Sequence, residues 1–151
     1  MKKLVLLVFI SLLTFQIWGQ DNTFQLTLNH LALSVTDVNR AAEFYGGVLK
    51  FQEITNRTKM DGIRWFSLGE GKELHLISTI KGNVSINKAV HLAMTTPNFD
   101  AFVSMLVKLN VAYSDWPGTP NKINIRADGI KQIFFQDPDG YWVEVNSVNQ
   151  K

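Results

Sequence analysis

The chain has 151 residues, of which 46% are apolar and 19% charged, a balance that supports a folded core and excludes a disordered chain. Because the sequence contains no cysteine, it excludes disulfides, thiolate metal sites, a cysteine nucleophile and lipid acylation. The formal net charge of +2 comes with no basic block of the kind that binds nucleic acid or an anionic membrane surface.

Residues 1–20 have the pattern of a secretory signal peptide. Two lysines precede the twelve-residue apolar run LVLLVFISLLTF, and Gly19 follows near the expected cleavage point. An uncleaved membrane anchor is the alternative, but the run is shorter than the ~20 apolar residues of a spanning helix. We therefore predict an exported protein, periplasmic or secreted, with one mature domain, residues 21–151, that leaves the membrane after processing. Loss of Lys2 and Lys3 with the leader brings the formal net charge to 0.

The sequence after the leader is an internal duplication. The stretch HLALSVTDVNRAAEFYGGVLKF, from His30, aligns with HLAMTTPNFDAFVSMLVKLNV, from His91. Each stretch predicts a strand, then a helix-capping residue, Asp37 or Asn98, and then an amphipathic helix. The apolar stripes of these helices consist of Val38, Ala41, Ala42, Tyr45 and Leu49 in the first, and Phe99, Phe102, Leu106 and Leu109 in the second.

A second pair of segments aligns without a gap. FSLGEGKELHLI, from Phe66, matches FQDPDGYWVEVN, from Phe135, and each predicts two strands joined by a tight turn. The second copy has extra residues before its hairpin, which we place in the loop-rich segment 114–132. Two βαβββ modules, about residues 26–81 and 88–148, follow from this order, joined by the polar linker KGNVSINK. The prediction is an α+β fold whose mixed sheet curls around a cleft.

Strand alternation places every histidine of the chain on the face away from the core. In the strand 29–35, His30 points away from the helices, because the apolar residues alternate with it. His91 has the same place in the second module. His75 and Glu144 occupy matching positions in the two hairpins, and they share the face of His30 and His91.

A metal site is the chemistry that this placement predicts. If a pseudo-twofold axis relates the modules, the four side chains converge, and imidazole with carboxylate suits Zn²⁺, Fe²⁺, Mn²⁺, Co²⁺ or Ni²⁺. Three or four protein ligands leave a coordination position open, as a catalytic metal requires. A single histidine or glutamate on a strand is usually an ordinary surface residue, so the symmetry of the set carries the prediction. His75 has a second interpretation, as a hydrogen-bonding group outside the ligand set.

The segments HLALSVTDVNRAAEFYGGVLKF, ELHLI, VHLAM and QDPDGYWVEVN resemble the vicinal oxygen chelate superfamily. That superfamily includes glyoxalase I, extradiol dioxygenases, methylmalonyl-CoA epimerase and the fosfomycin and bleomycin resistance proteins. The resemblance covers about residues 26–148, and it is specific for the fold but not for the reaction. It implies that His30, His91 and Glu144 are metal ligands and that His75 matches the fourth ligand position.

His75 departs from part of the superfamily. In the glyoxalase I type the fourth position is generally a carboxylate, so the resemblance does not imply a two-glutamate proton shuttle here. A single base, Glu144 or His75, could still abstract a proton. In the extradiol type a histidine outside the ligand set acts as acid or base, a role that His75 fits. The tyrosine usual in that type is replaced by Phe134, and we do not expect its additional N-terminal domain here.

Three residues are candidates for the substrate pocket. Trp142 adjoins the face of the predicted site, Trp116 lies in the long second-module loop, and Arg126 could hold an anionic group. The other cationic residues considered for that role, Arg57, Arg64 and Lys131, are more simply read as solvated charges.

The sequence thus predicts an exported, divalent-metal-dependent enzyme, a lyase, isomerase or dioxygenase. Its substrate would be a small molecule with vicinal oxygens, and Glu144 and His75 would be its catalytic residues. One alternative is a non-catalytic small-molecule-binding protein of the resistance type, and another is a module that binds metal only for stability. The pairing of modules within one chain or across a homodimer is left open.

Overall fold

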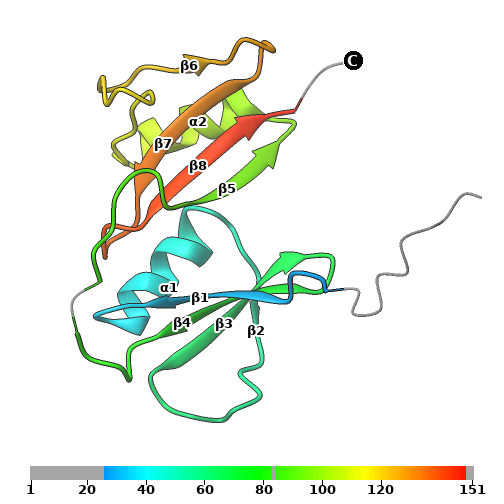
Figure 1. Ribbon diagram of the computed structural model, residues 1–151, viewed down its shortest axis with the longest axis vertical. Coiled ribbons are helices and arrows are strands. Elements are labelled where there is room, and N and C mark those ends of the chain that lie inside the picture. The colour runs from blue at the N-terminus through cyan, green and yellow to red at the C-terminus, as the bar shows by residue number, and fades with distance from the viewer. Residues whose placement is uncertain (1–25, 83, 149–151) are drawn as a thin grey trace, which may run out of the picture.

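The computed structural model describes residues 26–82 and 84–148, which form two modules of one plan (Figure 1). The first consists of β1 (His30–Ser34), α1 (Val38–Gly47), β2 (Glu53–Ile54), β3 (Ile63–Gly69) and β4 (Lys72–Ile77). The second consists of β5 (His91–Thr96), α2 (Phe99–Lys108), β6 (Asn124–Ile125), β7 (Lys131–Gln136) and β8 (Trp142–Ser147). The two predicted βαβββ modules are confirmed. The predicted leader, residues 1–20, lies outside the described residues.

Each module builds its own four-stranded mixed sheet, with strand orders β1-β4-β3-β2 and β5-β8-β7-β6. The β1–β4 and β5–β8 pairs are parallel and the other pairs antiparallel. Their registers match, because Ala32 lies beside His75 in the first sheet and Ala93 lies beside Glu144 in the second. The equivalence of His75 and Glu144 that the self-alignment predicts is therefore confirmed.

The two helices begin where predicted but are capped differently. Oδ1 of Asp37 accepts hydrogen bonds from the amides of Asn39 (2.8 Å) and Arg40 (3.1 Å). These bonds lower the pKa of Asp37. The side chain of Asn98 makes no such bond, so its predicted capping role is wrong. Its backbone, at φ −105° and ψ 43°, lies outside the extended conformation from which a capping side chain reaches the first turn.

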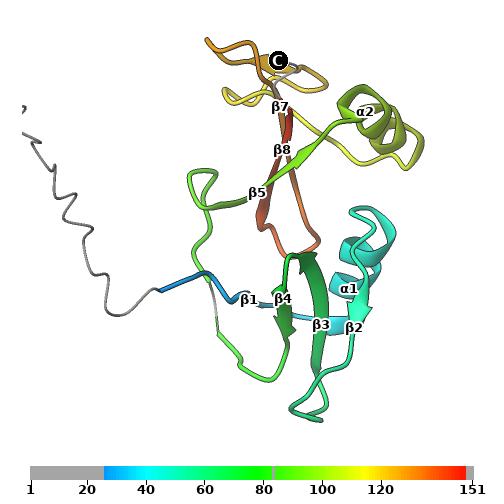
Figure 2. The ribbon, with the colours of Figure 1, turned by 90° about the vertical axis from the view of Figure 1, so that its right-hand side faces the viewer.

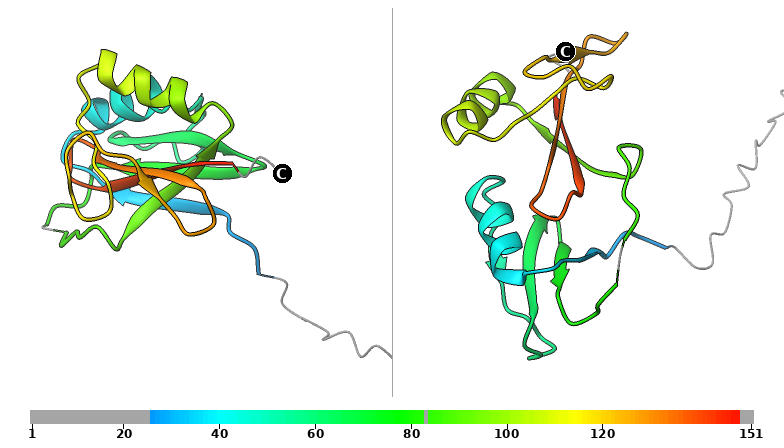
Figure 3. Two further views of the ribbon diagram at one scale, coloured as in Figure 1. Left: turned by 90° about the horizontal axis from the view of Figure 1, so that it is seen from above. Right: turned by 90° about the vertical axis from the view of Figure 1, so that its left-hand side faces the viewer.

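Each sheet packs one face on its own helix. The first core combines residues of α1 with β1, β3 and β4, and the second combines α2 with β5, β7 and β8. Phe44 of α1 packs against both cores. Figures 2 and 3 show that the helices lie on the same side of the molecule, so no helix in the described part of the chain covers the opposite face of either sheet. His30, His75, His91 and Glu144 belong to these helix-free faces, hereafter the open faces.

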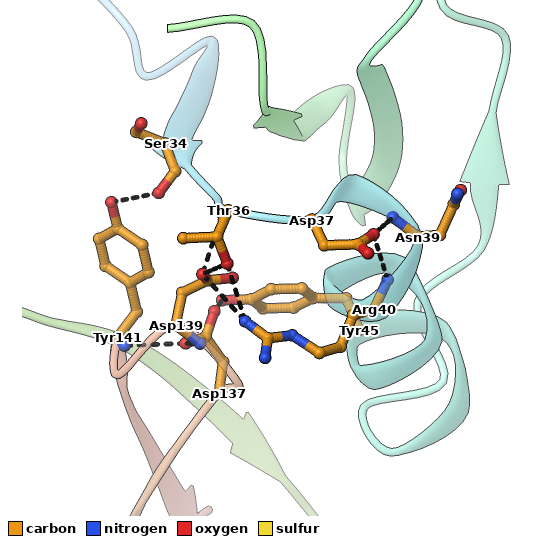
Figure 4. A network of polar contacts seen from close by, with 9 residues as sticks. All are labelled: Ser34, Thr36, Asp37, Asn39, Arg40, Tyr45, Asp137, Asp139 and Tyr141. Atoms are coloured by element: carbon orange, nitrogen blue, oxygen red, sulfur yellow. Dashed lines mark hydrogen bonds and ion pairs between the residues drawn. The ribbon is translucent and has the colours of Figure 1, made fainter. Parts of the chain in front are cut away.

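A polar network joins the modules (Figure 4). Asp139, in the turn between β7 and β8, accepts hydrogen bonds from the backbone amide and hydroxyl of Thr36 at 2.9 and 2.5 Å. The buried Tyr45 hydroxyl donates to Asp137 at 2.9 Å, and the Tyr141 hydroxyl donates to the Ser34 carbonyl at 2.9 Å. Burial raises the pKa of Asp137, although the hydrogen bonds it accepts act in the opposite direction. These contacts fix the β7–β8 turn against the β1–α1 connection.

Across residues 26–82 and 84–148, every helix is too short or too polar to cross a membrane. The expected processing of the leader is outside what these residues describe.

Candidate functional site

The four predicted ligands come together as two pairs. On β1 and β4 the rings of His30 and His75 stack with their centroids 4.3 Å apart and a 14° angle between their planes. On β5 and β8, Nε2 of His91 lies 3.0 Å from Oε2 of Glu144. We call these pairs the first and second half-sites. In the part of the chain that the structure describes, no group of three or more His, Asp or Glu side chains is arranged to hold a metal ion.

The second half-site contains a buried carboxylate without a basic side chain on its other oxygen. Oε1 of Glu144 accepts hydrogen bonds from the amide groups of Gln132 (2.8 Å) and Asn146 (2.6 Å). Neutral donors satisfy part of the hydrogen-bonding capacity of a buried carboxylate but do not neutralise its negative charge. The other oxygen of this carboxylate, Oε2, faces His91.

The protonation of His91 follows from its other ring nitrogen. Nδ1 lies 2.9 Å from the backbone carbonyl oxygen of Lys88, which can only accept, so Nδ1 carries the proton. In the neutral ring, Nε2 then carries a lone pair. This lone pair faces those of Oε2 of Glu144, and the two atoms are 3.0 Å apart. Two acceptors at this distance need a cation between or beside them, either a proton or a metal ion. A backbone carbonyl on the second nitrogen is also the usual partner of a metal-ligating histidine.

The first half-site is a stack of flat groups. The ring of His75 lies between the indole of Trp65, 4.0 Å away with a 6° angle between the planes, and the ring of His30. Nε2 of His75 lies 2.8 Å from Oε2 of Glu73, and Arg57 donates to both oxygens of Glu73. The hydrogen bonds from His75 and Arg57 lower the pKa of Glu73. Nδ1 of His30 pairs with the Asn29 side-chain oxygen at 2.8 Å.

Trp142 and Trp116 lie near the second half-site: Trp142 is the neighbour of His91 in the β5–β8 register, and the Trp116 ring centroid is 6.4 Å from that of His91. The Nζ atom of Lys88 lies 4.8 Å from the ring centroid of Trp142 and 5.8 Å from that of Trp116. It donates to the Ser114 hydroxyl and to the carbonyls of Asp115 and Trp116. Burial lowers the pKa of Lys88, partly offset by Asp115. The sequence analysis missed Lys88, whose only signal is its position three residues before His91.

Arg126 lies apart from both half-sites. Its guanidinium pairs with Asp128 at 2.8 Å in the exposed turn between β6 and β7. The other cations considered for an anionic substrate also have carboxylate partners: Arg57 with Glu73, Arg64 with Glu53 and Lys131 with Asp100. None of these contacts places a cation on His91 or Glu144.

A cavity of about 390 Å³ opens beside His91, between β1 of one module and β5 of the other. Its lining is mainly apolar and includes Leu31, Leu33, Leu92, Tyr141 and Trp142. His91 is the only lining side chain that can carry a positive charge, so the cavity suits an uncharged group. Its volume is within the range of small-molecule pockets.

Each half-site also has a buried polar atom without a partner. In the described residues these are Nε1 of Trp65, beside His75, and Oδ1 of Asn146, beside Glu144. Buried polar groups are satisfied in most proteins, and each exception needs an explanation. Both residues lie on the open faces, Trp65 opposite His75 and Asn146 two residues from Glu144 on β8.

Comparison with known proteins identifies the family. Residues 27–145 match the sequence profile of the Glyoxalase/Bleomycin resistance protein/Dioxygenase superfamily, and the chain belongs to this superfamily. The resemblance noted in the sequence is therefore confirmed.

Three relatives match this chain over almost the whole of their own length. An uncharacterized protein, YwbC, from Bacillus subtilis (strain 168) is 24% identical over 123 residues, covering 78% of this chain and 94% of YwbC. The structure of a glyoxalase/dioxygenase from Nostoc punctiforme has a TM-score of 0.65 at 22% identity, over 89% of this chain and 97% of that one. A lactoylglutathione lyase from Agrobacterium tumefaciens has a TM-score of 0.61 at 18% identity, over 80% and 92%. At these identities the structures establish the fold alone.

Proposed function

We propose that this protein is a divalent-metal-dependent enzyme that acts on a small molecule with two adjacent oxygens. The observation that carries the proposal is the contact of His91 with Glu144. Because Nδ1 of His91 is occupied by the Lys88 carbonyl, Nε2 and the carboxylate oxygen face each other as two acceptors at 3.0 Å. A divalent cation satisfies both, and it matches the nitrogen and oxygen donors present.

The residues that would hold the metal are His30, His91 and Glu144, with His75 either as a fourth ligand or as a hydrogen-bonding group. The Nδ1 atoms of His30 and His91 are both engaged by oxygens, which leaves Nε2 of each ring for the ligand role. Candidate metals are Zn²⁺, Fe²⁺, Mn²⁺, Co²⁺ and Ni²⁺. When bound, such a metal supplies Lewis-acid stabilisation of negative charge on adjacent substrate oxygens.

The chain's own residues then orient the substrate and exclude water. Trp142 and Leu92 line the apolar cavity beside His91, so an uncharged ring or short carbon chain next to the two oxygens fits there. Gln132 and Asn146 donate hydrogen bonds to Oε1 of Glu144, which fixes the direction of its other oxygen, Oε2. Glu144 and His75 are the groups proposed to move a proton in an isomerisation, lyase or ring-cleavage reaction.

A homodimer would complete the site. A single chain carries two half-sites on open faces, and each half-site contains a buried polar atom without a partner. If two copies pack by their open faces around a twofold axis, the first half-site of one meets the second half-site of the other. Two composite metal sites would result, each with His30 and His75 from one chain and His91 and Glu144 from its partner.

Metal analysis of the purified full-length protein tests the central proposal. We expect one divalent metal per chain in the wild type and its loss in H91A and E144Q. Iron would favour oxygen chemistry, whereas zinc, nickel or cobalt would favour an isomerase or lyase. A wild-type protein that binds none of the five candidate metals when they are added would contradict the proposal.

Mixing two variants tests the composite sites. H30A and H91A should each lose metal as separate homodimers. After subunit exchange, each mixed dimer would contain one site with both substitutions and one intact site, so about a quarter of the wild-type metal content should return. No recovery in a mixture that exchanges subunits would favour sites formed within one chain.

A non-catalytic ligand-binding protein is the second candidate function, and the apolar cavity beside His91 is the observation that favours it. In that case uncharged aromatic compounds would bind equally well to the metal-free protein and to H91A. We further propose that the protein is exported, on the evidence of residues 1–20. N-terminal sequencing of the protein recovered outside the cytoplasm should begin near Gln20 or Asp21.

A further inference from the structure

His75 is held in place more tightly than the other two histidines. Its ring lies between Trp65 at 4.0 Å and His30 at 4.3 Å, with angles of 6° and 14° between the planes. Only 11% of its side chain is exposed. Two parallel neighbours prevent the ring from tilting, so its remaining freedom is the choice between two orientations related by a 180° flip about the Cβ–Cγ bond.

The choice between these two orientations is fixed by a carboxylate. Nε2 of His75 lies 2.8 Å from Oε2 of Glu73, two residues away on the same face of β4. Glu73 is in turn held by Arg57, whose Nη2 donates to its two oxygens at 2.7 and 3.0 Å. The Arg57 guanidinium lies 4.6 Å from the centroid of the Trp65 ring, so Arg57, Trp65 and Glu73 form one connected support for His75.

The support gives His75 the opposite tautomer to its neighbours. A carboxylate only accepts hydrogen bonds, so the proton of a neutral His75 ring is on Nε2 and the lone pair on Nδ1. In His30 and His91 it is Nδ1 that pairs with an oxygen, the Asn29 amide oxygen and the Lys88 carbonyl. Their lone pairs are therefore on Nε2.

We propose that Glu73 is a positioning residue that keeps His75 in the Nε2–H tautomer, outside the metal's ligand set, with Nδ1 free to accept a hydrogen bond from a substrate hydroxyl. Among the described residues, no hydrogen bond reaches Nδ1 of His75, whereas its Nε2 is occupied by Glu73. The tautomer stands on the structure alone, and the role toward substrate rests on the proposed function. The tautomer alone would leave Nδ1 free for a metal ion as well. The rings of His75 and His30 are nearly parallel, with 14° between their planes and centroids 4.3 Å apart, so their in-plane lone pairs cannot meet at one ion. The ligand set is then His30, His91 and Glu144.

Imidazole ¹⁵N NMR of the metal-free full-length protein tests the tautomer. At a pH where the rings are neutral, we expect His75 to give one protonated Nε2 and one unprotonated Nδ1, and His30 and His91 to give the reverse. E73Q keeps an acceptor oxygen and should keep the fixed tautomer. E73L removes the acceptor and should move the two His75 shifts toward averaged values. E70L is the matched control, since Glu70 is on the same hairpin, 88% exposed, and pairs only with Lys72.

Metal titration tests the consequence for the ligand set. His75→Phe keeps a ring between Trp65 and His30 but removes both nitrogens, so we expect it to weaken metal binding by no more than about 10-fold, the lower end of the range for supporting contacts. H30Q should weaken binding by at least about 100-fold. A loss in H75F equal to that in H30Q would overturn the proposal, as would an Nδ1–H tautomer for His75 in the wild type. Failure of the wild type to bind metal would instead contradict the proposed function. The NMR test of Glu73 uses the metal-free protein, so its result does not depend on metal binding.

Discussion

Nε2 of His91 lies 3.0 Å from Oε2 of Glu144, and the second oxygen of Glu144 is bound only by amides, from Gln132 and Asn146. The pair joins the edge strand β5 to its parallel neighbour β8, where Ala93 leaves space beside Glu144. The amides of Gln132 and Asn146 hold the carboxylate in this geometry, and this dependence gives the first prediction.

Q132L should weaken metal binding without removing a ligand. The substitution removes the hydrogen bond from Gln132 to Glu144 and leaves the carboxylate less firmly oriented. Loss of such a supporting contact typically lowers metal affinity by about 10- to 100-fold. Isothermal titration with Zn²⁺ measures the change. Asn124, which donates to the side-chain oxygen of Gln132, provides a control, because N124L should have a smaller effect.

Y45F should destabilise the junction between the modules. The buried Tyr45 hydroxyl donates to Asp137, and its loss leaves a buried carboxylate with one donor fewer. We expect the free energy of unfolding to fall by about 2 kcal/mol, measured by urea denaturation. Y113F is the control, since the Tyr113 hydroxyl makes no hydrogen bond within the described residues. Equal effects of the two substitutions would show that the Tyr45 bond contributes nothing specific.

Asp137 should make stability depend on pH with a defined sign. Burial raises its pKa in the folded protein, so the folded state binds a proton more tightly than the unfolded state does. The resulting contribution is full below the unfolded pKa, about 3.9, and is lost as the pH rises through the higher folded pKa.

D137N removes this dependence. The free energy of unfolding of the wild type minus that of D137N should therefore decrease as the pH rises from about 4 toward neutrality. Asp37 and Glu73, whose pKa values are lowered, act equally in both proteins and cancel in the difference. A difference that grows with pH would contradict the burial of Asp137 as the dominant cause.

The two helix starts should respond differently to alanine. Asp37 accepts two amide hydrogen bonds from the first turn of α1, whereas Asn98 accepts none from α2. D37A should clearly lower Tm, and N98A should leave it close to the wild-type value. Differential scanning calorimetry of both variants measures the contrast. An equal drop in both would mean that Asn98 caps its helix in solution.

K88M should loosen the loop that carries Trp116. The Lys88 ammonium donates to Ser114, Asp115 and Trp116, so its loss leaves three acceptors near that loop without their donor. We expect the free energy of unfolding to fall by about 2 kcal/mol. Tryptophan emission should shift to longer wavelength, because Trp116 becomes more exposed to solvent. K108M is the matched control, because Lys108 is exposed at the end of α2 and its side chain makes no ion pair within the described residues.

The fold could be predicted from the sequence because the duplication repeats strong local signals. The alternation around His30 and His91 fixed the faces of two strands, and the turns at Gly71 and Gly140 fixed two hairpins. The helix starts were also readable, but the capping of α2 was not, because the backbone angles of Asn98 are set by its surroundings. A residue of a type that often caps helices does so only where its backbone angles let the side chain reach the first turn.

The candidate site was only partly predictable. Strand alternation identified the residues of the open faces, His75 and Glu144 among them, but alternation does not say how two sheets are placed. The partners of these residues were also beyond reach. Glu73 and Lys88 become significant only because their oxygens contact particular ring nitrogens of His75 and His91, a detail that no spacing rule contains.

Phe44 packs against the cores of both modules, although it belongs to the first. The duplication has therefore not produced two independent folding units, because each repeat completes its core with a shared helix residue. A half-chain ending in the linker would expose Phe44, and one beginning there would lack it. Unfolding should accordingly occur as one cooperative transition, in which the strands that carry both half-sites are lost together.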